Sequence, residues 1–377
     1  MIERILYQQI ETQLFKGKVV LLLGPRQVGK TTLLRSVFEQ YKDCAKWLNA
    51  DEADIAEELI EANTSTALAH LIGHDTKLVI IDEAQQIPNI GKRLKLIFDQ
   101  EPSIQLIATG SSAFELSDQM NEPLTGRKRT YHLFPFSFQE MVDAHGLREE
   151  KRLLEHRMRY GYYPDVINYP GEEREVLTEL VESYLYKDIL KLEGIRKPVF
   201  LEKILTALAL QLGSEVKYNE IARTVGNIDA NTVERYIDLL EKAFVVFKLP
   251  ALNRNFRNEI KKGKKYYFYD NGVRNAIINN FAPLDLRLDK GALWENFLVS
   301  ERIKYNHYHN SFVKPYFWRT KDQAEIDFIE DKDGVLYAFE MKWKKSNARL
   351  PQSFREHYKR YEFETVHTEN YEHFLMH

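Results

Sequence analysis

The residues from Gly24 to Thr31 combine glycines, a lysine and a hydroxyl in a spacing that suits phosphate chemistry. They read Gly-Pro-Arg-Gln-Val-Gly-Lys-Thr and match the pattern G-x-x-x-x-G-K-[ST] in full. Glycines in such a loop let backbone N–H groups surround phosphate oxygens, and the lysine balances their charge. The alternative is a glycine turn that arose by chance. We expect an ATP site whose binding residues are Gly24, Pro25, Arg26, Gln27, Val28, Gly29, Lys30, Thr31 and Thr32.

Two adjacent carboxylates, Asp82 and Glu83, follow a later apolar run. Oxygen ligands suit Mg²⁺, so we expect Thr31 and Asp82 to hold that ion. Glu83 is the candidate that orients and deprotonates the attacking water, and Lys30 is the candidate that stabilises charge. An acidic strand end is a weak signal alone. Together with the phosphate loop it predicts Mg²⁺-dependent hydrolysis rather than phosphate transfer to a metabolite.

Hydroxyl groups end a further apolar run, in Ala108-Thr109-Gly110-Ser111-Ser112. A polar side chain at this point would lie next to the γ-phosphate. Ser111 is the first candidate, followed by Thr109 and Ser112. The alternative is an ordinary turn, since Thr, Gly and Ser commonly end strands.

A second group of charged residues lies near the C-terminus. Alternate residues of a strand share a face, so Glu340 and Lys342 should point the same way. A hairpin through Asp333–Gly334 would bring Asp327 close to Glu340, and Glu295 could add a ligand from the preceding helix. This set predicts a second Mg²⁺ or Mn²⁺ site. The alternative is a charged, exposed strand face that holds no metal.

Alternating strands and helices must position the first site. Short runs predict strands over Lys18–Leu23, Ala45–Asn49, Leu78–Ile81 and Ile104–Thr109, with a helix over Thr31–Tyr41. Arg129–Leu133 is a candidate for a fifth strand. This alternation is typical of a parallel sheet with helices on both faces.

The remaining sequence lacks this regular alternation and predicts groups of helices followed by groups of strands. Helices are expected over Ser137–Tyr160, Arg174–Leu192, Phe200–Leu212, Tyr218–Thr224 and Ala292–Tyr305, and from a cap at Asp229 or Asn231 to Ala243. Strands are expected over Phe244–Lys248, Lys265–Tyr269, Tyr316–Trp318, Glu325–Glu330 and Val335–Lys342, followed by a helix and a short strand.

The middle of this region has the element order of a winged helix-turn-helix. Its wing carries the basic residues Arg254, Arg257, Lys261, Lys262, Lys264 and Lys265, which suit DNA phosphates. Its longer helix carries Glu234, Asp238 and Glu241, which DNA would repel. DNA binding and internal packing both stay open.

Composition sets outer limits. The 377 residues carry a net charge of −3, so the chain as a whole is not strongly basic. The single cysteine, Cys44, allows neither an internal disulfide nor a multi-thiolate zinc site, and indicates a cytoplasmic location. No run approaches the ~20 apolar residues of a membrane helix, so no membrane partner is expected.

Together the motifs resemble the prokaryotic AAA-like P-loop ATPases that carry a C-terminal winged helix and a PD-(D/E)xK nuclease-like domain. The resemblance spans essentially the whole chain and rests on Gly-Pro-Arg-Gln-Val-Gly-Lys-Thr, Ile-Ile-Asp-Glu-Ala-Gln, Thr-Gly-Ser-Ser-Ala, Leu-Thr-Gly-Arg, Phe-Pro-Phe-Ser-Phe, Tyr-Leu-Tyr-Lys-Asp-Ile, Glu-Ile-Asp and Glu-Met-Lys. It implies ATPase roles for Lys30, Asp82 and Glu83. It implies nuclease-motif roles for Glu295, Asp327, Glu340 and Lys342.

The resemblance also makes Arg127 a candidate catalytic arginine finger, which would reach the γ-phosphate of a neighbour in a homo-oligomer. The alternative is a basic surface turn.

The predicted fold class is α/β. We expect an ATPase domain over 1–145, a helical lid or linker over 146–198, a winged helix over 199–270 and a nuclease-like α/β domain over 271–377. Two functions stay open: an ATP-driven enzyme that acts on DNA through a metal-dependent nuclease-like domain, or an ATP-driven switch whose C-terminal modules only recognise partners.

Overall fold

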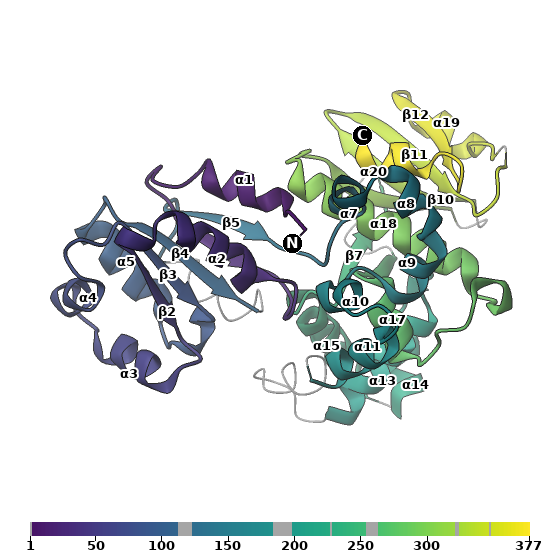
Figure 1. Ribbon diagram of the computed structural model, residues 1–377. Helices are drawn as coiled ribbons and strands as arrows, with labels where there is room; N and C mark the ends of the chain where they lie inside the picture. The colour runs from purple at the N-terminus through teal and green to yellow at the C-terminus, as the bar shows by residue number, and fades with distance from the viewer. Residues whose placement is uncertain are drawn as a thin grey trace. The chain divides into compact units, whose positions relative to one another are not determined.

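The computed structural model describes residues 2–111, 123–183, 198–226, 228–253, 263–320, 324–346 and 348–377. The chain divides into two compact units (Figure 1). Unit 1 comprises Met1–Phe134 and Lys242–Phe244, and unit 2 comprises Pro135–Glu241 and Val245–His377. The finer division into four domains stays a prediction.

Unit 1 is built on a parallel five-stranded sheet in the order β2-β3-β4-β1-β5. The strands are β1 (Val19–Leu23), β2 (Ala45–Asn49), β3 (Leu78–Asp82), β4 (Gln105–Gly110) and β5 (Lys128–His132). Every residue of β1, β3 and β4 is buried, as expected for the centre of a parallel sheet. The predicted strands and their parallel arrangement are confirmed. Because β4 lies between β1 and β3, the ends of these strands meet at one edge.

Helices surround this sheet (Figure 1). They are α1 (Ile5–Glu11), α2 (Lys30–Gln40), α3 (Ala53–Glu61), α4 (Ser65–Ile72) and α5 (Ile90–Gln100), with short 3₁₀ turns η1 (Lys42–Cys44) and η2 (Ala84–Gln86). The helix predicted over Thr31–Tyr41 is therefore present as α2, and it begins directly at the lysine of the glycine-rich loop.

Unit 2 begins with a helical region, and the helix predicted over 137–160 is broken into three. Its helices are α7 (Phe138–His145), α8 (Leu147–Arg152), α9 (Leu154–Tyr160), α10 (Pro164–Asn168) and α11 (Glu173–Leu180). The first break falls at Gly146, whose φ of 91° ends a helix. Of the helix predicted over Arg174–Leu192, the part from 184 onward lies outside the described residues.

A three-stranded sheet and its helices follow. The helices are α13 (Pro198–Leu210), α14 (Tyr218–Gly226) and α15 (Ala230–Lys242), and the strands β6 (Glu215–Val216), β7 (Val246–Pro250) and β8 (Lys264–Phe268) pair antiparallel in the order β6-β8-β7. Asp229 rather than Asn231 caps α15, because its carboxylate accepts hydrogen bonds from the backbone and hydroxyl of Thr232. The predicted helices and hairpin are present, and the short strand β6 was not predicted.

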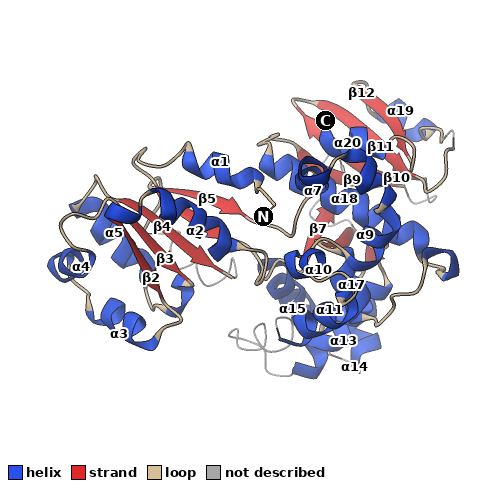
Figure 2. Ribbon diagram, in the orientation of Figure 1, coloured by secondary structure: helices blue, strands red, loops and turns tan. Residues whose placement is uncertain are grey.

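The C-terminal part of unit 2 is a mixed four-stranded sheet in the order β12-β11-β10-β9 (Figure 2). Its strands are β9 (Lys314–Arg319), β10 (Glu325–Lys332), β11 (Val335–Met341) and β12 (Tyr361–Val366). The accompanying helices are α17 (Asn271–Ile277), the turn η4 (Leu284–Leu286), α18 (Lys290–Tyr308), α19 (Gln352–His357) and α20 (Tyr371–Met376). Helix α20, after the last strand, was not predicted.

The segment Phe134–Phe138, whose role the sequence left open, anchors the start of unit 2. Its backbone is held by two charged side chains of α18: Glu301 accepts from the Phe138 N–H at 2.7 Å, and Lys304 donates to the Phe136 carbonyl at 3.1 Å. Glu301 and Lys304 also pair at 2.6 Å, with side chains 3% and 0% exposed. The motif is thus clamped to a buried ion pair.

In the part of the chain that the structure describes, no helix has both the length and the apolar character needed to cross a membrane.

Candidate functional site

The glycine-rich loop leaves β1 and enters α2 through two glycines that no other residue could replace easily. A Cβ on Gly24 would lie 2.1 Å from the Leu133 carbonyl oxygen, which is backbone and cannot move aside. Gly29 caps α2 with a φ of 90°, in the left-handed region that favours glycine. The loop therefore packs directly against the backbone that follows β5.

Lys30 is buried at the start of α2, with only 5% of its surface exposed. Its ammonium donates to the carbonyls of Gly24 and Pro25, both at 2.8 Å. Burial lowers the pKa of Lys30 to about 8, although the charges of Glu83 and Asp82 act in the opposite direction. The Lys30 ammonium is thus largely desolvated and held by the backbone of the glycine-rich loop.

Asp82 joins the phosphate loop to β4 through two hydroxyl groups. The Thr31 hydroxyl donates to its Oδ2 at 2.8 Å, and the Thr109 hydroxyl donates to its Oδ1. Thr109 also accepts from the Glu83 N–H at 2.9 Å. The structure thus brings Thr31, Asp82 and Glu83 together as predicted, and it places Thr109 rather than Ser111 against the acidic pair.

Ser111 lies two residues after Thr109 and contacts Gln85. The Gln85 side-chain amide donates to Ser111 Oγ at 3.2 Å and to Glu83 Oε2. Glu83 itself has a φ of 52°, an uncommon value for a residue with a side chain. Gln85 was not among the candidates, because its partner Ser111, which follows β4, is 26 positions away in the sequence. Ser112 lies outside the described residues.

Arg127 lies just before β5, at the opposite end of the sheet from the phosphate loop. Its carbonyl accepts from the N–H of Val19, the first residue of β1. Its guanidinium pairs with Asp99 at 3.1 Å, and both side chains are about two-fifths exposed (40% and 43%). An exposed ion pair of this kind contributes little to stability.

The C-terminal carboxylates come together as the hairpin prediction required. Strands β10 and β11 pair antiparallel with Phe328 opposite Phe339, so the same register places Asp327 opposite Glu340. Asp327 accepts from the Met341 N–H at 2.7 Å, and Lys342 donates to Glu340 at 2.7 Å. Asp327, Glu340 and Lys342 therefore lie in one cluster with the fourth predicted nuclease-motif residue, Glu295 of α18.

Lys265 of β8 also belongs to this cluster, which corrects the sequence interpretation of Lys265 as one of the wing residues that suit DNA phosphates. Its side chain is 1% exposed and pairs with Glu295 at 3.1 Å and Glu325 at 2.6 Å. Tyr267 also donates to Glu295, at 2.6 Å. Burial alone would lower the pKa of Lys265, but the two carboxylates raise it above its usual value.

Burial raises the pKa of Glu295 to about 7, against the opposing effect of the Lys265 charge. Burial likewise raises the pKa of Asp327 and of Glu340. The described residues contain no group of three or more His, Cys, Asp or Glu side chains placed to hold a metal ion. The predicted second Mg²⁺ or Mn²⁺ is therefore not supported by this arrangement, in which ammonium groups and backbone N–H groups pair with the carboxylates.

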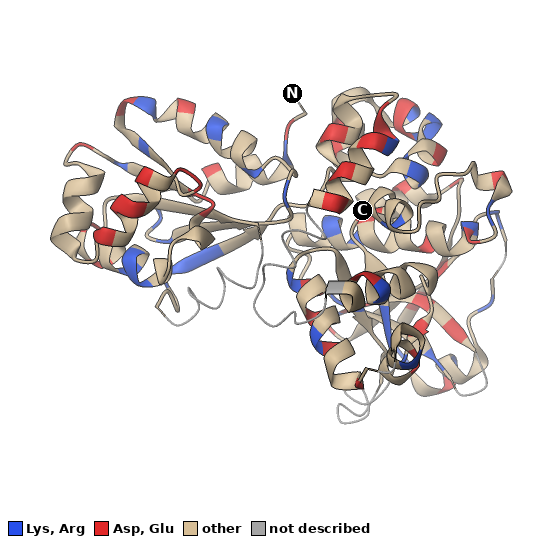
Figure 3. Ribbon diagram, turned by 90° about the horizontal axis from the view of Figure 1, so that it is seen from below, with Lys and Arg blue, Asp and Glu red and all other residues tan. Residues whose placement is uncertain are grey.

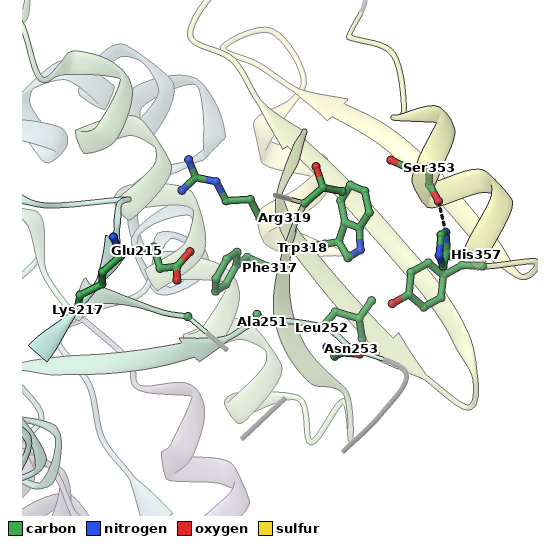
Figure 4. Close-up of a pocket in the computed structure, with 13 residues that line it drawn as sticks. Glu215, Lys217, Ala251, Leu252, Asn253, Phe317, Trp318, Arg319, Ser353 and His357 are labelled. Atoms are coloured by element: carbon green, nitrogen blue, oxygen red, sulfur yellow. Dashed lines mark hydrogen bonds between the residues drawn. The ribbon is translucent and has the colours of Figure 1, made fainter. Parts of the chain in front are cut away.

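A cavity of about 650 Å³ lies beside this cluster in unit 2 (Figure 4). Trp318 and Arg319 of β9 form its middle, with Lys217 on one side and His357 of α19 on the other. Arg319 approaches Glu325 at 3.7 Å, which links the cavity wall to the cluster. The lining carries both signs of charge, since Glu215 faces the same space.

Two acidic residues of α15, the longer helix of the predicted winged helix, pair with lysines of β8 and β7. Glu234 of α15 pairs with Lys264 of β8 at 3.3 Å, and Lys248 of β7 lies 3.7 Å from Glu241. Figure 3 shows basic and acidic residues intermixed along the elements of unit 2 rather than gathered by sign. Arg254, Arg257, Lys261 and Lys262 lie outside the described residues.

Comparison with known families agrees with the geometry of the first site. Residues 16–142 match a family model described as an AAA domain. Residues 151–284 and 290–371 match two models described as domains of unknown function (DUF8612 and DUF4143). Residues 16–142 are therefore similar to AAA domains, in agreement with the parallel sheet of unit 1.

Similar whole proteins and structures are found as well. An uncharacterized protein from Mycobacterium tuberculosis is 28% identical over 92% of this chain and 75% of its own length. One from Haemophilus influenzae is 26% identical over 86% and 80%. AMPPCP-bound DnaA from Aquifex aeolicus is 16% identical, covering 63% of this chain and 86% of that chain with a TM-score of 0.30. The RuvB Holliday junction branch migration motor of Thermotoga maritima is 17% identical, covering 69% and 95%, with a TM-score of 0.33.

Proposed function

We propose that this protein binds ATP and hydrolyses it with Mg²⁺. The observation that carries the proposal is the Thr31–Asp82–Thr109 hydrogen-bond network next to the buried Lys30. Thr31 and Asp82 offer hydroxyl and carboxylate oxygens, the donors that Mg²⁺ prefers, and Lys30 offers an ammonium to phosphate oxygens. These residues fit the nucleotide and its ion, and bound Mg²⁺ would neutralise phosphate charge.

The remaining residues of the site have separate roles in this proposal. Glu83 accepts a proton from the attacking water, and its backbone is held by Thr109. The loop backbone from Gly24 to Gly29 surrounds the phosphates, and Thr32 extends the binding set at the helix start. Ser111 contacts the γ-phosphate with its hydroxyl.

Two substitutions test this proposal. Lys30→Ala should lose ATP turnover and ATP binding together, because the phosphate charge is no longer balanced. Glu83→Gln should keep ATP bound while turnover falls by roughly 10²–10⁴-fold, the usual contribution of a general base. Binding is measured with a fluorescent ATP analogue and turnover by ADP release. ATP turnover at the wild-type rate in Lys30→Ala would refute the proposed site.

Arg127 would complete the site of a neighbouring copy in a homo-oligomer. Its weak exposed pair with Asp99 supports this proposal. If Arg127 acts across an interface, Arg127→Ala should lower turnover without weakening ATP binding, and wild-type turnover per molecule should rise with protein concentration. Asp99→Ala is the control, because it breaks the same pair and leaves the guanidinium. Equal turnover in Arg127→Ala and wild type would leave Arg127 as a surface residue.

For unit 2 we propose that the winged-helix and nuclease-like modules recognise a partner, and that this partner is DNA. ATP turnover in unit 1 would change the position of these modules. The observation that favours recognition over cleavage is Lys265, which pairs with Glu295 and Glu325 in the carboxylate cluster. The competing proposal is DNA cleavage with Mg²⁺ or Mn²⁺. Incubation of plasmid and branched DNA with wild type and Glu340→Ala separates the two: cleavage by wild type alone would establish the nuclease.

A further inference from the structure

Gln85 connects two residues of the proposed ATPase site that do not contact each other in any other described way. Its amide nitrogen lies 3.2 Å from Ser111 Oγ and also donates to Glu83 Oε2. Glu83 follows β3, and Ser111 follows β4. The side chain of Gln85 therefore bridges the ends of two neighbouring strands.

The orientation of this amide is fixed by chemistry. An ionised carboxylate only accepts hydrogen bonds, so the group that faces Glu83 must be the Gln85 NH₂ and not its oxygen. The same NH₂ has a second hydrogen, which points to Ser111 Oγ. Because Ser111 accepts through a lone pair, its own hydroxyl hydrogen stays available to donate elsewhere.

The other end of the amide has an unusual environment. Gln85 Oε1 is buried and lacks a hydrogen-bond partner within the described ranges. A buried acceptor without a partner lowers the stability of the folded state, because it has lost its hydrogen bonds to water. If position 85 served only for packing, an apolar residue of similar size would fill the same space without an unpaired acceptor. The arrangement favours a role that needs the two N–H groups of Gln85.

We propose that Gln85 is a positioning residue that couples recognition of the γ-phosphate to the orientation of Glu83. The Ser111 hydroxyl donates to the γ-phosphate, accepts from Gln85, and Gln85 in turn holds the Glu83 carboxylate. Linked hydrogen bonds of this kind strengthen one another. The proposal rests on the ATPase function proposed above, and it adds a physical basis for distinguishing ATP from ADP, which has no γ-phosphate.

The test compares Gln85→Glu, Gln85→Ala and wild type. Gln85→Glu keeps size and shape but replaces both N–H donors by acceptors, and Gln85→Ala removes the side chain. Both should lower kcat by on the order of 10- to 100-fold, the effect of a misplaced catalytic group, while the KM for ATP changes little. Gln86→Glu is the matched control, because it adds the same charge at the exposed neighbouring residue, which bonds Asp51.

A double-mutant cycle then separates coupling from two independent effects. If Ser111 acts through Gln85, Ser111→Ala with Gln85→Ala should be no slower than the slower single variant. Wild type should bind a non-hydrolysable ATP analogue more tightly than ADP, and both Gln85 variants should lose part of that preference.

Several results would overturn the proposal. A Gln85→Glu variant with wild-type kcat would show that only the shape of Gln85 matters. Multiplicative rate losses in the double variant would show that Ser111 and Gln85 act independently. Failure of the ATPase proposal is distinguishable, because wild type itself would then not turn over ATP. Thermal unfolding of each variant identifies a loss that comes from misfolding.

Discussion

The hydroxyl of Thr31 donates to the carboxylate of Asp82 at 2.8 Å, across 51 positions of sequence. This bond ties the first turn of α2 to the end of β3, and Thr109 holds the other oxygen of the same carboxylate. Both carboxylate oxygens of Asp82 therefore accept hydrogen bonds that join the phosphate loop to strands β3 and β4.

Thr109 should matter for both stability and turnover. Thr109→Val removes a fully buried hydroxyl and leaves one Asp82 oxygen and the Glu83 N–H without their partner. We expect a loss of ~1–3 kcal/mol in the free energy of unfolding, with reduced ATP turnover. Urea denaturation measures the first and ADP release the second. Thr109→Ser, which keeps the hydroxyl, should stay close to wild type, and a comparable loss in both variants would contradict the hydrogen-bond explanation.

Gly24 should tolerate no side chain. The Cβ of Gly24→Ala would lie 2.1 Å from the Leu133 carbonyl oxygen, so the loop or the end of β5 must shift. We expect a clear fall in the urea midpoint and weaker binding of a fluorescent ATP analogue. Gly291→Ala is the control, because a Cβ there meets nothing within 4 Å. Similar urea midpoints for Gly24→Ala and Gly291→Ala would mean that the loop accommodates the added Cβ at little cost in stability.

The buried pair beneath the Phe134–Phe138 segment should be costly to break. Lys304→Met leaves the Glu301 carboxylate, 3% exposed, without its cation. Removing one partner of a buried pair typically costs ~3–5 kcal/mol, so unit 2 should unfold at a much lower urea concentration. Lys217→Met breaks the exposed Lys217–Glu220 pair and should change little. The prediction fails if both variants unfold at the same midpoint.

The carboxylate cluster predicts a pH dependence of stability. The pKa of Glu295 is raised by burial from 4.5 to about 7, so between these values the folded state binds more protons than the unfolded state. Stability from this group is therefore full below pH ~4.5 and falls as pH rises through 7. Glu295→Gln, which resembles the protonated form, should show a flatter stability curve across that window.

Urea midpoints at several pH values between 5 and 8 measure this difference. Glu220→Gln, on the exposed pair with Lys217, is the matched control and should follow the wild-type curve. Parallel curves for wild type and Glu295→Gln would show that Glu295 does not titrate in this range.

The sequence correctly predicted elements that are determined by residues close together along the chain. The alternation of short strand-like runs with helical patterns located the parallel strands, and the Asp333–Gly334 turn correctly joined β10 to β11. The pattern of Gly24–Thr31 located the loop. Local pattern could not separate Asp229 from Asn231 as a cap, nor reveal that Gly146 interrupts a helical stretch.

Contacts across the fold were harder to anticipate. Lys265 is one basic residue among several in its segment, and only the pairing of β8 with the cluster around Glu295 shows that it is buried. Gln85 follows Asp82 and Glu83, whose carboxylates alone account for the chemistry that the motif predicts. Its importance depends on the packing of β3 beside β4, which brings Ser111 within reach.

The contact of the phosphate loop with the end of β5 has a mechanical consequence. Arg4 donates to the Val28 carbonyl of the loop at 2.9 Å and to the Phe134 carbonyl at 2.6 Å. Phe134 is the last residue of unit 1 before the chain enters unit 2. The guanidinium of Arg4 therefore links the phosphate loop to Phe134. A displacement of the phosphate loop would therefore strain the hydrogen bonds of Arg4 and act on Phe134, where the chain leaves unit 1.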